Sequence, residues 1–240
     1  MSLFTVDDTR CTRCGACVDE CPARIIALAD RHSLPEIVPG GSELCIACGH
    51  CVAVCPHGAL ALAAMPIETC PIITERIDDP ARVERFLRAR RSIRSYRKRP
   101  VDRQTIERLI DIARHAPSGH NAQPLEWLVV HTEGETRRLA GLVIEWMRIV
   151  LRDFPEQAKA AHMDLVIAGW EMGIDAVLRG APHLLLCHAP KDNMMARAAG
   201  TIALAYLELA APSLDLGSCC AGFFDAARSE EHTSELQSRF

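Results

Sequence analysis

Two stretches of the chain, CTRCGACVDECP at residues 11–22 and CIACGHCVAVCP at residues 45–56, carry the same cysteine pattern. Each has cysteines separated by two, two and three residues, with a proline after the last, and a shift of 34 positions (11 to 45) superimposes all four cysteines. The shift also places Gly15 on Gly49 and CPARIIALA on CPHGALALA. The beginning of the chain is therefore an internal duplication of one small unit, with too few copies for a solenoid.

Three kinds of chemistry use cysteines at high density. Disulfides need an oxidising compartment, and because residues 1–10 carry two Asp and no apolar stretch, we expect no signal peptide. Zinc prefers two separated cysteine pairs that close one tetrahedron, which three cysteines within seven residues suit poorly. Two [4Fe–4S] clusters fit both the spacing and the repetition, so the pattern favours clusters over the other two.

Residues 1–64 resemble the two-cluster ferredoxin domain of bacteria. The resemblance implies that three cysteines of one stretch and the last cysteine of the other hold each cluster. Cluster one would then use Cys11, Cys14, Cys17 and Cys55, and cluster two would use Cys45, Cys48, Cys51 and Cys21. We expect His50 to be a neighbour of the second cluster or simply exposed. The four other cysteines lack this spacing, and we expect them to be packed thiols: Cys70, Cys187, Cys219 and Cys220.

The composition of the 240 residues is that of a globular protein, with 49% hydrophobic and 24% charged residues. The net charge of −4 and the 5% of aromatic residues argue against a nucleic-acid partner. No apolar run approaches the roughly 20 residues of a membrane helix, so we expect no membrane partner and a cytoplasmic location. Prolines at 66, 71 and 80 indicate a linker over residues 65–80.

A basic stretch follows this linker. RRSIRSYRKRPV at residues 90–101 sets cations and a hydroxyl close together, which suits a phosphate monoester. The stretch, a helix after it and APSGHNAQPLEW from residue 116 resemble the opening of the nitroreductase family of FMN enzymes. That resemblance implies FMN binding by Arg90, Arg91, Ser92 and Arg94. It also implies that a second segment lines the flavin from the partner subunit, with Pro117, Ser118, Asn121 and Gln123.

Other interpretations of these segments remain open. PSGHNAQP is also a good turn sequence, and nothing compels His120 to approach the flavin. The cations between Arg94 and Arg103 are either a solvated surface or a docking site for an acidic electron donor, and we favour the solvated surface. The segment DLGSCCAGFF resembles the family's strand under the flavin ring, where backbone N–H groups of Ala221 and Gly222 would face the flavin.

The remaining periodicity predicts an α+β chain. The small two-cluster domain is followed by a nitroreductase-like domain, in which helices flank a central, mostly antiparallel sheet. Expected helices begin near Pro80 and cover 103–115, 134–152, 155–179 and 194–211, and expected strands cover 127–132 and 182–187. The last helix is apolar on most sides, and the resemblance implies that it lies in the interface of a homodimer.

The chain ends in RSEEHTSELQSRF, and residues 228–238 look like the translation of a common sequencing adapter. We expect residues 228–240 to be a non-native tail and the flavin domain, residues 81–227, to be truncated. The expected organisation is thus a ferredoxin domain over 1–64, a linker over 65–80, an incomplete flavin domain and this tail.

The resemblance implies an oxidoreductase without catalytic side chains, because FMN carries the chemistry. We expect electrons to enter the clusters from a ferredoxin or another low-potential donor, to pass to FMN, and to leave to an electron-poor small molecule. Nitro compounds, quinones and activated unsaturated compounds are the candidate acceptors. Two alternatives remain: direct reduction of FMN by NAD(P)H with the clusters as auxiliary wiring, and an electron carrier or redox sensor without catalysis.

Overall fold

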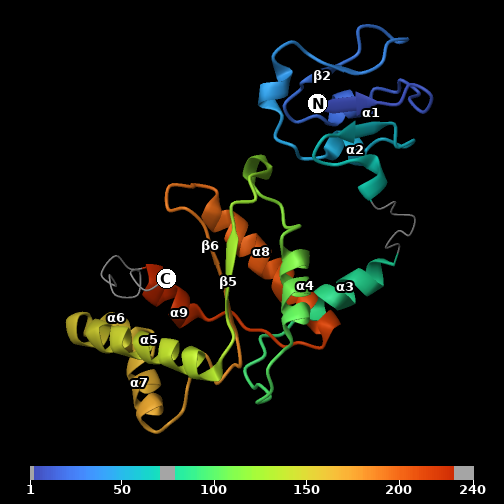
Figure 1. Cartoon of the computed structure of the whole chain (residues 1–240). Helices are drawn as coiled ribbons and strands as arrows, with labels where there is room; N and C mark the ends of the chain where they lie inside the picture. The colour runs from blue at the N-terminus through green and yellow to red at the C-terminus, as the bar shows by residue number, and fades with distance from the viewer. Residues whose placement is uncertain (1–2, 71–78, 230–240) are drawn as a thin grey trace. The chain divides into compact units, whose positions relative to one another are not determined.

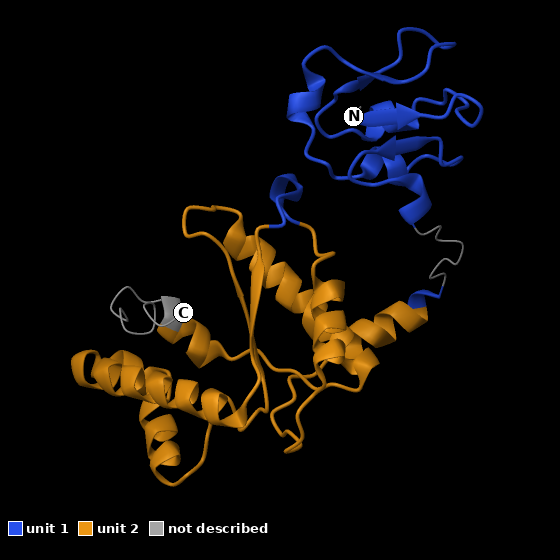
Figure 2. Ribbon diagram, viewed as in Figure 1, with its two compact units in different colours: residues 1–80, 118–123 blue, residues 81–117, 124–240 orange. Residues whose placement is uncertain are grey.

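The computed structural model describes residues 3–70 and 79–229 of the chain (Figure 1). Contacts divide the chain into one unit of residues 1–80 with 118–123 and a second of residues 81–117 with 124–240 (Figure 2). The first unit thus includes a segment that lies far from it in the sequence, and the domain boundaries at 64 and 81 stay a prediction. Part of the expected linker, 71–78, and most of the expected tail, 230–240, lie outside the described residues.

The first unit consists of short elements in two similar halves. Strand β1 (Phe4–Val6) pairs antiparallel with β4 (Leu60–Leu62), and β2 (Ile26–Ala27) pairs antiparallel with β3 (Glu36–Ile37). The other elements are the helices α1 (Ala16–Glu20) and α2 (His50–Ala53) and the 3-10 turns η1 (Gly41–Leu44), η2 (Ile67–Thr69) and η3 (Gly119–Asn121).

Backbone conformation confirms the duplication. Arg13, Gly15 and Arg24 have φ values of 58°, 78° and 51°. Their counterparts 34 positions later, Ala47, Gly49 and Gly58, have φ values of 47°, 74° and 55°. This left-handed conformation is unfavourable for most side chains, so its recurrence at three matched positions shows that both copies fold the same way.

The second unit is mostly helical, with one small sheet. Strands β5 (Glu126–Val130) and β6 (Leu184–His188) pair antiparallel, with Trp127 opposite Cys187. Its helices and turn are α3 (Pro80–Ala89), α4 (Arg103–Ala113), α5 (Glu133–Asp153), α6 (Pro155–Ala160), α7 (Met163–Glu171), α8 (Ala196–Ala210), η4 (Ala211–Leu214) and α9 (Gly222–Ser229). The expected antiparallel arrangement is confirmed, but the sheet in the described residues has only these two strands.

Each face of this sheet contacts a different helical cluster, as alternating strand side chains require. Leu184 and Leu186 face a core centred on α5, with Val143, Ile144 and Met147 fully buried. The other face contributes Trp127 and Leu185 to a second core formed by α4 and α8. Helices therefore flank the sheet on both sides (Figure 1).

The prediction of one long helix over residues 155–179 is wrong. The chain leaves the helix after Ala160, passes through His162 with a φ of 56°, and begins α7 at Met163. This break lets both α6 and α7 pack against α5. Periodicity misses the break because apolar residues continue through it. No helix in the described ranges 3–70 and 79–229 is long and apolar enough to cross a membrane.

A hydrogen bond of His183 connects the residue just before β6 to the end of the basic stretch at Val101. The Nε2 of His183 accepts a hydrogen bond from the Val101 N–H at 2.8 Å, which places the proton of the neutral ring on Nδ1. Nδ1 is buried without a partner among the described residues. Burial lowers the pKa of His183, and the nearby His131 lowers it further.

The sign of this pKa shift predicts a pH-dependent stability. Because the folded state holds fewer protons on His183 than the unfolded state, the ring's contribution to stability is lost as the pH falls below about 6.5. We expect the melting temperature to fall between pH 7 and pH 5, and to fall less in His183→Gln. Thermal unfolding followed by circular dichroism measures this, with the exposed His115→Gln as control. An equal fall in His183→Gln would contradict the role of His183.

Candidate functional site

The cysteines of the first unit line two cavities. The first is lined by Cys11, Cys14, Cys17 and Cys55. The second is lined by Cys45, Cys48, Cys51 and Cys21. Each cavity thus receives three cysteines from one copy of the repeat and the last cysteine from the other copy. These are the two groups implied by the ferredoxin resemblance; that they bind clusters stays a prediction.

Local structure explains this arrangement. Gly15 and Gly49 adopt left-handed conformations just before α1 and α2, which turns the chain sharply after the second cysteine of each motif. The third cysteines, Cys17 and Cys51, lie in the first turn of each helix and are buried. Cys21 ends α1 in an extended conformation and lines the other copy's cavity.

The donor set in each cavity fits a cluster. Burial raises the pKa of the Cys17 thiol. Burial, with the charge of Cys48 and then of Cys21, raises the pKa of the Cys51 thiol to about 11. Apposed buried thiols favour a bound cation that removes their protons. The Ala59 N–H already donates to the Cys55 sulfur at 3.2 Å, the kind of contact that tunes a cluster.

Other metal arrangements are less well supported. None of the twelve cysteines, all of which lie in the described residues, forms a disulfide. Within residues 3–70 and 79–229, no three His, Cys, Asp or Glu side chains gather around one metal ion. A cubane does not need that, because each thiolate binds a different iron. His50 does not line the second cavity; its exposed ring contacts Glu20 at 3.3 Å. His57, which sequence reasoning missed, lines the first cavity.

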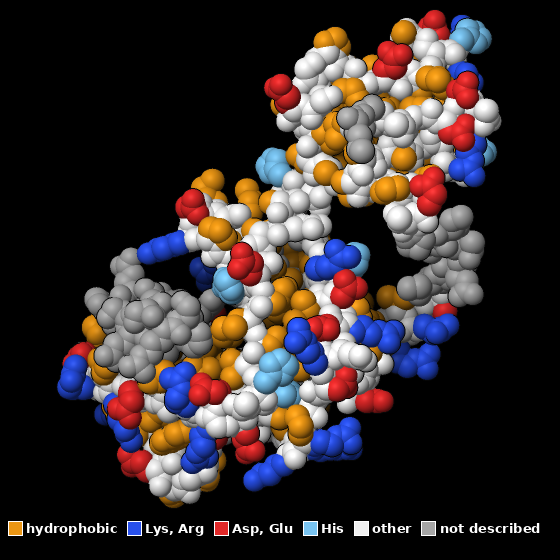
Figure 3. All heavy atoms as spheres, viewed as in Figure 1, with side chains coloured by type: hydrophobic (Ala, Val, Ile, Leu, Met, Phe, Trp, Pro, Cys, Tyr) orange, Lys and Arg blue, Asp and Glu red, His pale blue; other side chains and the backbone are white. Residues whose placement is uncertain are grey.

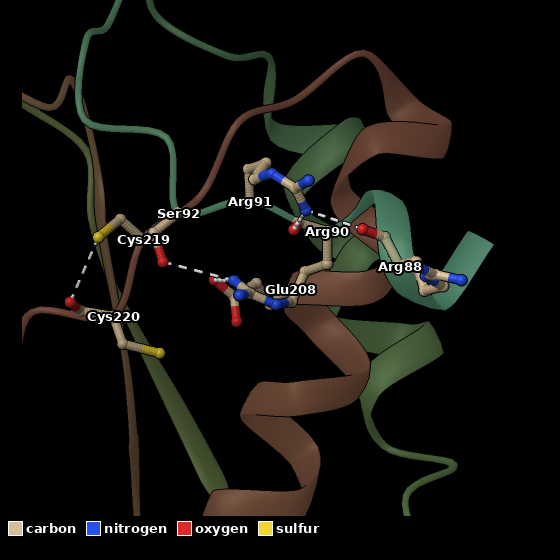
Figure 4. A network of polar contacts seen from close by, with 7 residues as sticks. All are labelled: Arg88, Arg90, Arg91, Ser92, Glu208, Cys219 and Cys220. Carbon is tan, nitrogen blue, oxygen red and sulfur yellow. Dashed lines mark hydrogen bonds and ion pairs between the residues drawn. The ribbon is translucent and has the colours of Figure 1, made fainter. Parts of the chain in front are cut away.

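In the second unit, the expected flavin segment lies against the end of α8 (Figure 4). Arg90 Nη1 donates to Glu208 Oε1 at 3.1 Å and to Ser92 Oγ at 3.4 Å. Arg91 Nη1 donates to the carbonyl oxygens of Arg88 and Arg90, both at 2.7 Å. Arg94 is exposed. The structure therefore brings Arg90 and Ser92 into one network and directs Arg91 back to the chain itself.

A backbone contact holds this segment in place. The Ile93 N–H donates to the Ser218 carbonyl at 2.9 Å. Gly217 makes the contact possible, because a Cβ at this position would lie only 2.8–3.0 Å from side-chain atoms of Ile93. The absence of a side chain at Gly217 therefore sets the position of the segment from Arg90 to Arg94.

We expect Gly217→Ala to weaken FMN binding without unfolding the protein. The added methyl displaces Ile93 and with it the arginines on either side. The measurement is a fluorescence titration of flavin-free protein with FMN, compared with Gly134→Ala, where a Cβ meets no atom within 4 Å. An unchanged dissociation constant in Gly217→Ala would show that the close approach to Ile93 does not position the site.

The second predicted flavin segment belongs to the first unit. Ser118 Oγ accepts a hydrogen bond from the Gln123 N–H at 2.9 Å, so PSGHNAQP does form a turn, which follows Pro117. Asn121 donates through Nδ2 to the carbonyls of Ala47 at 3.0 Å and Ile46 at 3.3 Å, between Cys45 and Cys48. Flavin contact by Pro117, Ser118, Asn121 and Gln123 stays a prediction. The sequence did not indicate the contact of Asn121 with the second cysteine loop.

The segment expected as a strand under the flavin is not a strand. Residues 217–221 form no regular element, and Gly222 begins helix α9. A Cβ at Gly222 would meet no atom within 4 Å, so the chain's own packing does not require glycine there. The helix forms because Phe224 and Ala227 bury against the α5 core, which outweighs the local pattern. Flavin contact by the backbone of Ala221 and Gly222 stays a prediction.

Of the four cysteines that we expected to be packed thiols, Cys220 is the exception, because it is exposed. Cys70, Cys187 and Cys219 are partly buried. Cys219 Sγ donates to the Cys220 carbonyl at 3.5 Å. Desolvation raises the pKa of the Cys220 thiol, and the charge of Glu208 raises it further. The carboxylate of Glu208 therefore acts on this segment as well as on Arg90.

Comparison with known proteins agrees with this architecture. Residues 87–237 match the model of the nitroreductase family, and residues 10–59 match that of a 4Fe-4S dicluster domain. The nitroreductase NfnB of Mycolicibacterium smegmatis is 29% identical over 170 residues, which are 60% of this chain and 71% of that protein.

Two solved structures share the fold. A nitroreductase with bound FMN from Bacteroides fragilis has a TM-score of 0.51 and 18% identity, covering 65% of this chain and 76% of its own. A nitroreductase with bound FMN from Desulfitobacterium hafniense has a TM-score of 0.51 and 21% identity, covering 64% and 77%. At these identities the likeness concerns the fold alone.

Proposed function

The chain belongs to the nitroreductase family and is an FMN-dependent oxidoreductase with a 4Fe-4S dicluster domain, and we propose that it carries electrons from a low-potential donor to an electron-poor small molecule. The acceptor is a nitro, quinone or activated unsaturated compound. The observation that carries this proposal is the pair of four-cysteine cavities on a chain that also holds the family's reductase domain. We place the domains at residues 1–64 and 81–227.

The residues of the chain bind and position the cofactors. When bound, the clusters supply one-electron transfer, and FMN supplies the conversion between one-electron and two-electron chemistry. The eight cysteines hold the clusters in the two groups that line the cavities. In the second domain, Arg90, Arg91, Ser92 and Arg94 hold FMN, with the backbone of Ala221 and Gly222 beside it, and Pro117, Ser118, Asn121 and Gln123 line it from a partner subunit.

Asn121 supports a path from the second cluster. Its amide donates to two backbone carbonyls between Cys45 and Cys48, inside the first unit. A segment assigned to the flavin is therefore bonded to the loop assigned to the second cluster. We propose that Asn121 fixes this segment on the loop that would hold the second cluster, and that this cluster, when bound, would supply one-electron transfer toward FMN.

The proposed partners follow from this chemistry. They are a ferredoxin or similar donor, a small-molecule acceptor and a second copy of the chain. The exposed apolar residues Ile202 and Tyr206 on α8 support the homodimer. A reducing compartment, the cytoplasm, suits the twelve cysteines. On the face that Figure 3 shows, cations and carboxylates are mixed over the second unit, so we do not assign the donor site to the basic stretch.

The test is anaerobic reconstitution followed by separate reduction with a reduced ferredoxin and with NAD(P)H. About eight irons and one FMN per chain, with flavin bleached by ferredoxin alone, would support the proposal. Flavin bleached by NAD(P)H in protein stripped of iron would support the pyridine-nucleotide alternative. Eight irons without any flavin binding would leave an electron carrier or sensor and refute the proposal.

A further inference from the structure

Glu208 occupies an unusual position for a carboxylate. It is the only acidic residue of α8, ARAAGTIALAYLELA, and its side chain is only 15% exposed. It lies in the last turn of the helix, where the helix dipole disfavours a negative charge. Burial of an ion and an opposing dipole both cost free energy, so the carboxylate needs a compensating partner.

Arg90 is that partner, and some N–H groups of its guanidinium remain available for another ligand. The ion pair uses Nη1 of the guanidinium at 3.1 Å, and the same atom lies 3.4 Å from Ser92 Oγ. Within the described residues, every hydrogen bond of the Arg90 side chain uses Nη1, and Nε and Nη2 have no protein acceptor. A guanidinium has five N–H donors in a fixed plane, so one edge can hold Glu208 while another holds a second anion.

The pair connects distant parts of the second unit. Glu208 lies in the last turn of α8, a helix that packs in the core of the second unit. Arg90 directly follows α3, and all side chains of α3 are exposed. Arg90 thus stands on a segment with little packing of its own. The buried carboxylate fixes the direction of a side chain that would otherwise sample many rotamers, and that ordering is complete before any ligand arrives.

We propose that Glu208 is a positioning residue for the flavin: it holds Arg90 so that the remaining N–H groups of the guanidinium receive the phosphate of FMN. The inference rests on the proposed flavin function. It also explains why an acidic residue stands beside an anion site, since its effect comes through orientation of the arginine and outweighs the repulsion between the two anions.

The experiment is a titration of flavin-free full-length protein with FMN and with riboflavin, followed by flavin fluorescence. Glu208→Gln keeps the shape and removes the charge. We expect it to raise the dissociation constant for FMN about tenfold, by analogy with the roughly 10- to 100-fold losses of metal affinity when a residue that orients a metal ligand is replaced. We expect little change for riboflavin, which lacks the phosphate. Glu107→Gln, which breaks the exposed pair of Glu107 with Arg103 at 2.6 Å, is the matched control.

A double-variant comparison separates positioning from general stability. If Glu208 acts through Arg90, Glu208→Gln will not weaken FMN binding further in an Arg90→Gln background. Glu208→Asp retains the charge, is expected to stay within about threefold of the parent, and serves as the folded reference. Equal weakening by Glu208→Gln in both backgrounds, or unchanged or tighter FMN binding in the single variant, would overturn the proposal. Failure of the parent chain to bind FMN would instead refute the proposed function.

Discussion

Substitution of Cys51 by alanine is expected to lower the iron content from about eight to about four per chain and to abolish reduction of the flavin by ferredoxin. Cys51 is only 8% exposed and lies both in the lining of the second cavity and in the core of the first unit. Its loss removes a ligand and opens the cubane to solvent. Iron assay and flavin absorbance measure the two effects.

The crossed ligand groups make this prediction sharper. If Cys21 serves the second cluster, Cys21→Ala with Cys51→Ala should retain about four irons, because both changes destroy the same cluster. Cys21→Ala with Cys17→Ala should retain almost none, because the two changes destroy different clusters. The opposite outcome would mean that each motif binds its own cluster. Cys70→Ala, whose sulfur lies in the same unit but lines neither cavity, is the control.

Substitution of Arg90 by alanine is expected to weaken FMN binding by roughly 10- to 100-fold. A hydrogen bond to a charged group contributes about 1.5–3 kcal/mol, and each 1.4 kcal/mol is about tenfold in affinity. The change also leaves the largely buried Glu208 carboxylate without its partner, which adds repulsion toward the phosphate. Fluorescence titration with FMN measures the loss.

Arg103→Ala is the control for this change, because it removes an arginine two residues beyond the basic stretch, at the start of α4, that pairs with Glu107 on the surface. Surface pairs of this kind contribute little, so its affinity for FMN should stay near that of the parent. Equal losses in both variants would show that Arg90 acts only through the general positive charge of the stretch.

Sequence patterns predicted the elements of this chain well wherever a pattern was local. The helices at 103–113, 133–153 and 196–210 and both strands of the second unit lie within a few residues of their expected bounds. Patterns failed where packing decided the result. His162 breaks an apolar run so that two short helices can cover α5, and Phe224 draws the segment after Gly222 into a helix.

The sequence by itself determined the cysteine loops, because a ligand group spaced within twelve residues and repeated at 34 is a local property of the chain. The family resemblance likewise rested on short motifs. Only the tertiary structure decided which distant residues meet: Asn121 with the carbonyls of Ile46 and Ala47, Ile93 with Gly217, and Arg90 with Glu208 across 118 positions. These pairs depend on how whole elements pack, and no periodicity along the chain records that packing.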